Sequence, residues 1–168
     1  MTVEEKEQIF LQWQREHRGI VLKVARSYAA SKGDQEDLAQ EILIQLWQSV
    51  DRFENQAKPS TWIYRVALNS AMAWQRGERR RRHRIARMVE LDAYWLKAEG
   101  PESELLNRLY ESIRQLTPHE RSLVLLYLDD LKYADIADVI GISESNVGVR
   151  INRVKKRLTE LCNKGSDS

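Results

Sequence analysis

The sequence is poor in residues that break helices or cross-link the chain. Its 168 residues include seven glycines, three prolines and one cysteine, Cys162. So few turn-forming residues favour helices over a sandwich of many short strands. A lone cysteine excludes an internal disulfide and fits a reducing compartment. No apolar run approaches the roughly 18 residues of a membrane span, and the acidic N-terminus is not that of a signal peptide. We therefore expect a soluble, cytoplasmic protein.

The sequence also lacks the residue groupings of an active site. Its three histidines, His17, His83 and His119, lie in three separate segments. It has no Walker loop, no HExxH motif and no Cys-His cluster. Asp37 and Glu41 stand one helical turn apart, but nothing else in the chain completes a catalytic site with them. We expect no catalysis, no metal and no cofactor.

Charge is unevenly distributed, although the net charge is only +2. Residues 76–88 contain seven arginines and one glutamate, and residues 148–164 contain six basic residues and one glutamate. Between these blocks, residues 88–104 contain five acidic residues and one lysine. Two basic blocks split by an acidic segment indicate two polyanion-binding surfaces on separate modules; solvated helix faces are the alternative.

Apolar periodicity predicts an N-terminal module over residues 1–85. Its first helix should run from Val3 to about Tyr28, after which Gly33 ends that helix and Asp34 caps the next. The second helix has apolar residues at a spacing of four: Leu38, Ile42, Leu46 and Val50.

A third helix should follow an aperiodic loop at 53–59, with Ser60 or Thr61 as its cap. This helix continues into the arginine block. Its apolar and small residues are Trp62, Ile63, Val66, Ala67 and Ser70.

Residues 86–103 are predicted to form an acidic linker that ends after Gly100-Pro101, and residues 104–168 a second helical module. A helix should occupy about 104–115. Thr117, Pro118 and Glu120 then form a strong helix start, with Thr as N-cap, Pro at the first position and Glu completing a capping box.

The segment 133–147 has the pattern of a helix-turn-helix, although an ordinary helical hairpin remains an alternative. Ile136, Ala137 and Ile140 share one apolar face. Gly141 supplies a left-handed turn residue, Ile142 fills the angle between the helices, and Ser143 caps the second helix. The predicted fold is therefore all-α: two small helical domains joined by a linker, the C-terminal one a helix-turn-helix.

The final helix should present a polar face to DNA. Its inward stripe consists of Val147, Ile151, Val154, Leu158 and Leu161. The residues that point away from this stripe are Ser145, Val149, Asn152, Arg153 and Lys156. Arginine can pair with guanine and asparagine with adenine in the major groove. Lys155, Lys156 and Arg157 are expected to bind phosphates, which position a protein without specifying sequence.

Three segments together resemble the extracytoplasmic-function (ECF) sigma factors, the minimal two-domain sigma factors of bacterial RNA polymerase. They are DQEDLAQEILIQLW at 34–47, PSTWIYRVALN at 59–69 and LTPHERSLVLL at 116–126, the last followed by the helix-turn-helix. Their order, with an acidic linker between, spans nearly the whole chain. The resemblance implies an initiation factor that binds core polymerase and promoter DNA and does no chemistry itself.

The resemblance implies that the second helix docks on the clamp helices of the polymerase's largest subunit. The implied contact residues are Asp37, Gln40 and Glu41, with Leu43 and Trp47 as an apolar anchor. A solvated acidic face remains the alternative for the three polar residues.

The resemblance also implies that the loop and third helix capture the melted −10 strand, since aromatic stacking and cations favour single strands. The implied residues are Asn55, Lys58, Trp62, Tyr64, Arg65, Asn69, Arg76, Arg79 and Arg80. Simple core packing is the alternative for Trp62.

The helix-turn-helix would bind the −35 element as duplex. The implied residues are Ser145, Asn146, Val149, Arg150, Asn152, Arg153 and Lys156. The chain departs from the family at Ala73, where an Asp is common, and at 143–147, which reads SESNV. These departures affect individual base contacts.

The acidic linker resembles the segment that passes through the polymerase's RNA exit path, and such factors are usually restrained by an anti-sigma protein. Two alternatives remain. One is a conventional helix-turn-helix regulator that does not join the polymerase core. The other is an interaction protein whose acidic helix binds a partner while its basic tail binds RNA.

Overall fold

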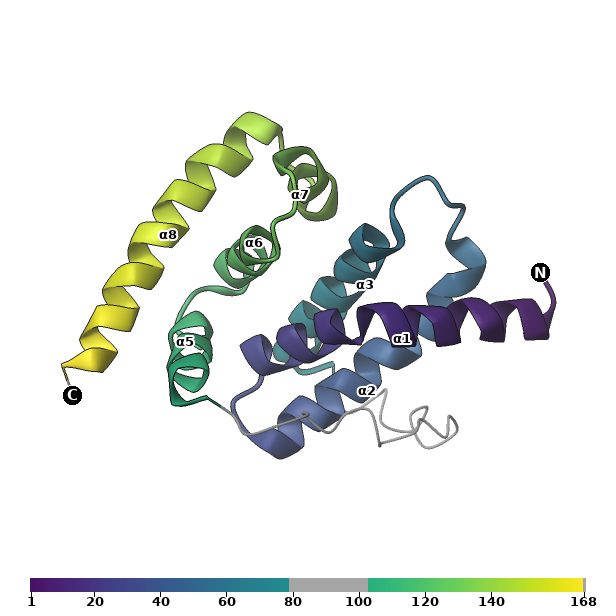
Figure 1. Ribbon diagram of the computed structural model, residues 1–168, viewed down its shortest axis with the longest axis horizontal. Coiled ribbons are helices and arrows are strands. Elements are labelled where there is room, and N and C mark those ends of the chain that lie inside the picture. The colour runs from purple at the N-terminus through teal and green to yellow at the C-terminus, as the bar shows by residue number, and fades with distance from the viewer. Residues whose placement is uncertain (79–102, 168) are drawn as a thin grey trace. The chain divides into compact units, whose positions relative to one another are not determined.

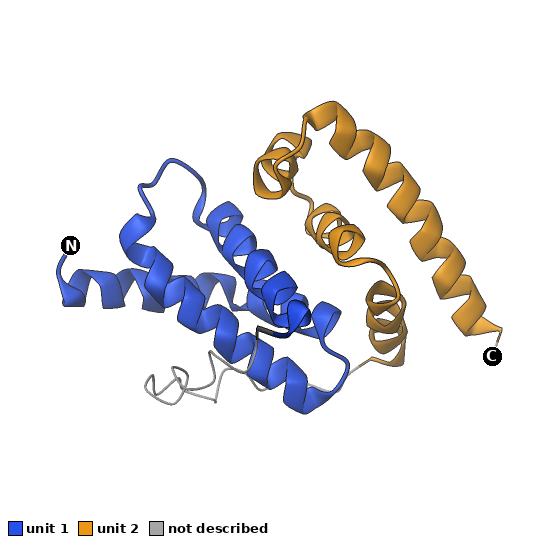
Figure 2. Ribbon diagram, turned by 180° about the vertical axis from the view of Figure 1, so that it is seen from behind, with its two compact units in different colours: residues 1–98 blue, residues 99–168 orange. Residues whose placement is uncertain are grey.

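Every regular element is helical in the part of the chain that the computed structural model describes, residues 1–78 and 103–167 (Figure 1). The predicted all-α class is therefore confirmed. The chain divides into two compact units, unit 1 (Met1–Ala98) and unit 2 (Glu99–Ser168) (Figure 2). Nearly all of the expected linker lies outside the described residues, and the module ends at 85 and 104 remain predictions.

Unit 1 is built from three helices that each contact the other two: α1 (Val3–Tyr28), α2 (Lys32–Ser49) and α3 (Pro59–Ala73). A short 3-10 turn, η1 (Val50–Arg52), follows α2, and a π-helical turn, η2 (Trp74–Glu78), follows α3. Residues 53–58 form the loop between η1 and α3. The expected helices and loop are therefore present, with α1 at its predicted bounds.

The core of unit 1 surrounds α2. The predicted stripe of Leu38, Ile42, Leu46 and Val50 is fully buried, which confirms the inward face. Ile44 and Leu43 are buried as well, although they lie outside that stripe. Because α1 and α3 both pack against α2, the helix buries a much wider surface than its period-four pattern predicts.

Two predicted helix caps in unit 1 are wrong. Ser31, not Asp34, caps α2: its hydroxyl accepts a hydrogen bond from the Asp34 backbone N–H at 3.1 Å, and Gly33 lies inside the helix. The third helix begins at Pro59, one residue before the proposed Ser60 or Thr61 cap. Proline suits the first helical position because its φ is already helical and that position needs no N–H partner.

Unit 2 consists of α5 (Glu104–Arg114), α6 (Pro118–Leu128), α7 (Tyr133–Ile140) and α8 (Glu144–Ser166). The long α8 contacts all three other helices and runs past them in turn (Figure 1). Four residues of the predicted inward stripe of α8 are buried, Val147, Ile151, Val154 and Leu158, whereas Leu161 near its end is half-buried.

The turn of the predicted helix-turn-helix has the expected construction. Gly141 ends α7 in the left-handed region, with φ 81°, which glycine adopts without steric cost. The backbone N–H groups of Gly141 and Ile142 both donate to the Ala137 carbonyl, at 2.8 and 3.2 Å. Ser143 then caps α8 by accepting from the Asn146 N–H. The turn prediction is confirmed.

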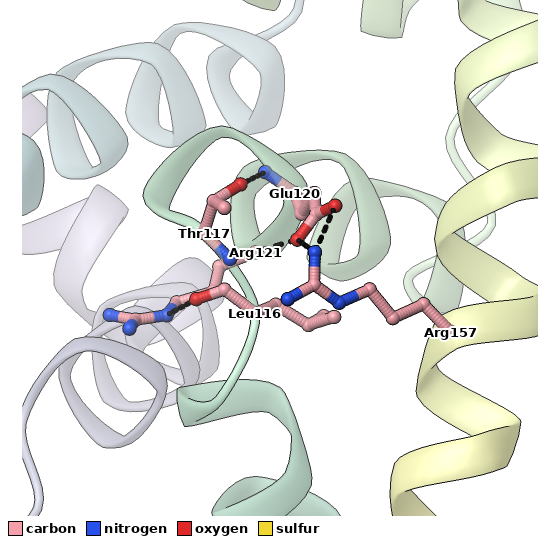
Figure 3. A network of polar contacts seen from close by, with 5 residues as sticks. All are labelled: Leu116, Thr117, Glu120, Arg121 and Arg157. Carbon is pink, nitrogen blue, oxygen red and sulfur yellow. Dashed lines mark hydrogen bonds and ion pairs between the residues drawn. The ribbon is translucent and has the colours of Figure 1, made fainter.

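A polar network holds α8 to the start of α6 (Figure 3). Thr117 and Glu120 form the predicted capping box, with reciprocal hydrogen bonds of 2.8 and 3.3 Å. The Glu120 carboxylate also accepts two hydrogen bonds from Nη1 of Arg157, at 3.0 and 3.2 Å. The Glu120 carboxylate thus caps the N-terminus of α6 and also binds Arg157 in the middle of α8.

Candidate nucleic-acid interface

The outer face of α8, made of Ser145, Val149, Asn152, Arg153 and Lys156, is exposed along its whole length. It lies opposite the stripe that packs on α5, α6 and α7, as the 3.6-residue helical period requires. Asn146 and Arg150 flank it and are exposed too. The face therefore combines amide and guanidinium groups on an uncovered helix, the arrangement that a DNA-binding helix needs. Its contacts with DNA stay a prediction.

Gly148 brings α7 and α8 close together beside this face. A Cβ on Gly148 would stand 3.5 Å from the Tyr133 ring at the start of α7, so the ring occupies the side of α8 where no side chain projects. This contact was not predicted from the sequence. It brings the start of α7 beside the first turns of α8.

Two of the three residues expected to bind phosphates are engaged within unit 2. Arg157 pairs with Glu120, and the Lys155 amine lies 4.9 Å from the centre of the Tyr127 ring. Hydrogen bonding to Tyr127 raises the pKa of Lys155 above its ordinary value, and the charge interaction with Tyr127 adds to this rise. Only Lys156 belongs to the outer face. Arg157 has a structural partner in Glu120, and its side chain is 49% exposed, so its phosphate role stays a prediction.

In unit 1, four of the seven described residues implied in −10 strand binding are exposed. Asn55 is at the loop, in a left-handed conformation with φ 56°, and it is exposed. The remaining exposed members of this group are Lys58, Asn69 and Arg76, while Arg65 is half-buried. Arg79 and Arg80 lie outside the described residues.

Tyr64 cannot contact DNA as implied, because its side chain is only 1% exposed. It shares a wide buried face of α3 with Ile63, Ala67 and Leu68. This face is wide because α1 and α2 both pack against α3. Tyr64 is therefore a core residue, and this correction removes it from the surface that could bind a strand.

An aromatic cluster fixes the ends of the loop at 53–58. Phe53 packs edge-on against Trp13 of α1, with ring centres 5.2 Å apart, and lies 5.7 Å from the ring of Trp62. The indole N–H of Trp62 donates to the Ser49 hydroxyl at 3.1 Å. Trp62 thus ties α3 to the end of α2. Phe53 and Ser49 were missed by sequence reasoning; the aromatic residues on both sides of the loop were the available signal.

The residues implied in polymerase docking differ in exposure. Asp37 and Gln40 are half-exposed, whereas Glu41 is 8% exposed and accepts a hydrogen bond from Gln45 at 3.1 Å. Leu43 is only 1% exposed. It cannot be the surface anchor that the resemblance implied, because it belongs to the second buried face of α2.

Trp47, the other implied anchor, is half-buried in a local cluster with the start of α1. Its ring lies edge-on to Phe10, with centres 5.3 Å apart, and beneath the Lys6 amine at 4.8 Å. Lys6 also pairs with the Asp51 carboxylate. Part of the indole therefore remains accessible, but its main contacts are within unit 1.

Unit 2 also carries an apolar groove of about 340 Å³ between α5 and the end of α8. Leu105, Leu106 and Cys162 help to line it, and Leu105 is 77% exposed. Exposed apolar surface of this kind is typical of protein-binding sites. The sequence analysis missed this groove, because it predicted a helix at 104–115 without assigning a role to its exposed leucines.

In the described ranges, no cluster of three or more His, Cys, Asp or Glu side chains has an arrangement that could hold a metal ion. None of the helices there combines the length and apolar character that crossing a membrane requires.

Two family models match the chain in succession: sigma-70 region 2 at residues 13–81 and sigma-70 region 4 at residues 106–158. The ECF RNA polymerase sigma factor SigW of Bacillus subtilis is 29% identical over 142 residues, covering 75% of this chain and 76% of SigW. The sigma factor NccH of Alcaligenes xylosoxydans xylosoxydans is 25% identical over 160 residues, covering 90% of this chain and 86% of NccH.

Solved structures share the fold. The sigma factor RpoE of Bartonella quintana, in complex with the anti-sigma factor NepR, aligns with a TM-score of 0.65 at 22% identity, over 90% of this chain and 97% of RpoE. CnrH, in complex with the cytosolic domain of CnrY, aligns with a TM-score of 0.65 at 23% identity, over 96% of this chain and 91% of CnrH.

The chain has a three-helix unit that matches sigma-70 region 2, followed by a helix-turn-helix unit that matches sigma-70 region 4. These two matches in that order define an RNA polymerase sigma factor. The relatives narrow the class: the chain belongs to the ECF sigma factors. These matches do not favour the alternative function, a conventional helix-turn-helix regulator that does not join the polymerase core.

Proposed function

We propose that the two units divide promoter recognition between them, with unit 2 binding the −35 element as duplex through α8. The observation that carries this proposal is the uncovered outer face of α8, where Asn152 and Arg153 stand side by side without a packing role. Asparagine and arginine are the side chains that pair two-pronged with adenine and guanine in the major groove. Lys156 and Arg150 add charge for the phosphates.

Unit 1 binds the melted −10 strand through the loop at 53–58 and the exposed side of α3. Asn55 and Lys58 offer polar groups at the loop, and Asn69 and Arg76 continue the surface beyond it. Trp62 and Phe53 hold the two ends of the loop in place. A fixed loop can accept an unstacked base more readily, because the protein does not have to order it on binding. Arg79 and Arg80, which follow in the sequence, bind the phosphates of the same strand.

Core polymerase binds on α2 through Asp37 and Gln40, which are half-exposed at neighbouring positions of one helix face. Glu41 supports this face through its hydrogen bond with Gln45. The clamp helices of the largest subunit are the proposed partner. Trp47 contributes the accessible part of its indole.

The protein works as a subunit that positions polymerase, not as an enzyme, and it acts in the cytoplasm, where promoters and polymerase are. We also propose an anti-sigma partner, because RpoE, a structural relative, was solved in complex with one. The apolar groove beside α5 offers such a protein a surface separate from the outer face of α8.

Run-off transcription with core polymerase tests whether the protein directs initiation at promoters with −10 and −35 elements. The full chain should produce new transcripts whose start sites share −10 and −35 elements. An Asp37→Ala, Gln40→Ala double variant should weaken binding to core polymerase, measured by competition against the wild type. Glu36→Ala, which removes an exposed carboxylate next to Asp37, is the matched control and should bind normally.

Variants of α8 complete the test. Asn152→Ala and Arg153→Ala should leave polymerase binding intact but reduce transcription that depends on the −35 element. Asn163→Ala, an exposed amide near the end of the same helix, should reduce neither. The absence of chain-dependent transcripts, or equal loss of polymerase binding in the α2 and α8 variants, would contradict the proposal.

A further inference from the structure

Val149 stands out on the outer face of α8 because it is the exposed apolar residue of that helix. Its side chain is 50% exposed, whereas Val147 and Ile151, two residues away on either side, are fully buried. Successive helical residues turn by about 100°, so Val149 lies about 200° from Val147. It therefore points away from every helix that α8 packs on within unit 2.

The fold gives no reason for valine at this position. A β-branched residue loses rotamer freedom in a helix and is a weaker helix former than alanine, lysine or glutamine. The exposed neighbours of Val149 on the same face are all polar: Ser145 one turn before, Asn152 and Arg153 one turn after. The site is thus a single branched apolar group surrounded by hydrogen-bonding groups.

These surroundings argue against an apolar protein surface as the partner, because the centre of a protein interface is depleted of charged residues. The other exposed apolar side chains of unit 2 lie on other helices: Leu105 and Leu106 on α5, Leu128 at the end of α6 and Tyr133 at the start of α7. In the major groove, by contrast, one apolar group is displayed among donors and acceptors: the C5-methyl of thymine.

We propose that Val149 selects a thymine in the −35 element by packing against its C5-methyl group. Ser145 and Asn152, one turn to either side, then face the base pairs that flank this thymine. The ring of Tyr133 at the start of α7 lies beside Gly148, the residue before Val149, so α7 adjoins this part of α8. The inference rests on the proposed binding of the −35 duplex by α8.

The experiment replaces each thymine of the −35 element, one at a time, with deoxyuridine, which keeps every hydrogen-bonding group and removes only the methyl. Holoenzyme made with the full chain is then bound to each promoter duplex. Wild-type holoenzyme should lose about fourfold in affinity at one position, the size expected for one methyl-sized contact. Val149→Ala should bind the thymine promoter about fourfold more weakly and should show no further loss with deoxyuridine.

Two controls separate this contact from general damage. Val149→Ile keeps a branched apolar side chain and should keep its sensitivity to the methyl. Val3→Ala, which shortens an exposed valine of unit 1, should behave as the wild type. Alanine is the stronger helix former, so Val149→Ala is expected to fold.

The inference is overturned if the −35 element contains no thymine, if no thymine methyl matters to the wild type, or if Val149→Ala keeps the full sensitivity. Failure of the proposed function looks different. In that case scrambling the −35 element, or Asn152→Ala, would leave promoter binding unchanged, whereas failure of this inference alone leaves both of those effects in place.

Discussion

The two units expose their proposed contact residues in different ways. In unit 2, α8 packs on its neighbours through one stripe that includes Val147 and Ile151, and its opposite face is uncovered. In unit 1, each of the three helices contacts the other two, and residues outside a simple stripe, such as Leu43 and Tyr64, are buried. One-sided packing leaves a whole face of α8 uncovered, the face proposed to bind DNA, whereas mutual packing in unit 1 leaves the proposed contact residues at the loop, the helix ends and narrow exposed strips.

The largest expected effect separates core from contact residues within α3. Tyr64→Ala should lower the free energy of unfolding of unit 1 by about 3–5 kcal/mol, because it removes a fully buried aromatic side chain. Four of the five tryptophans, Trp13, Trp47, Trp62 and Trp74, lie in the described part of unit 1, so intrinsic tryptophan fluorescence in a urea titration reports mainly on this unit.

Asn69→Ala is the matched control on the same helix. Its exposed side chain should contribute within about 0.5 kcal/mol to stability, while its loss weakens strand binding. If Tyr64→Ala unfolds at the wild-type urea concentration but binds the −10 strand poorly, Tyr64 is a contact residue after all, and the contrast between the two units fails.

The next effect concerns the link between α6 and α8. Glu120→Ala should destabilise unit 2 by about 1–2 kcal/mol, because it removes both the reciprocal cap on Thr117 and the partner of Arg157. Arg157→Ala removes only a half-exposed ion pair and should cost about 0–1 kcal/mol. Amide hydrogen exchange at the start of α6 distinguishes the two variants, because only Glu120→Ala removes the cap on Thr117. Equal protection in both variants would mean that the capping box contributes nothing measurable.

A smaller effect tests which basic residues of α8 face DNA. Lys156→Ala should reduce the slope of log affinity against log salt by about 0.9, since one phosphate contact is lost. Arg157→Ala should leave the slope unchanged, because its guanidinium is paired with Glu120. Promoter binding by holoenzyme, measured across a series of salt concentrations, gives the slope for each variant. The same reduction in the two variants would mean that Arg157 contacts a phosphate as well, despite its pairing with Glu120.

The difference between the units also explains which features of the fold and the candidate site could be predicted from the sequence. Residues whose role depends on one helix and its cap, such as Gly141 and Ser143, were predicted correctly because local periodicity and turn chemistry determine them. The burial of Tyr64 depends on which two helices cover α3, and the pairing of Arg157 with Glu120 joins residues 37 positions apart. Periodicity within one helix carries no information on such tertiary contacts.

The smallest expected effect lies at the edge of α8, where Lys155 turns from the outer face toward Tyr127 of α6. Hydrogen bonding to Tyr127 raises the pKa of the Lys155 ammonium, so Tyr127→Phe should return this pKa toward its ordinary value. A raised pKa in the folded state means that the interaction stabilises unit 2 fully below the unfolded pKa of about 10.4, and that this contribution is lost as pH rises through the folded pKa. Titration of the Lys155 side chain by NMR measures the shift directly. An unchanged titration in Tyr127→Phe would mean that Tyr127 does not hold the ammonium, and Lys155 would then join Lys156 among the cations that one-sided packing leaves for DNA.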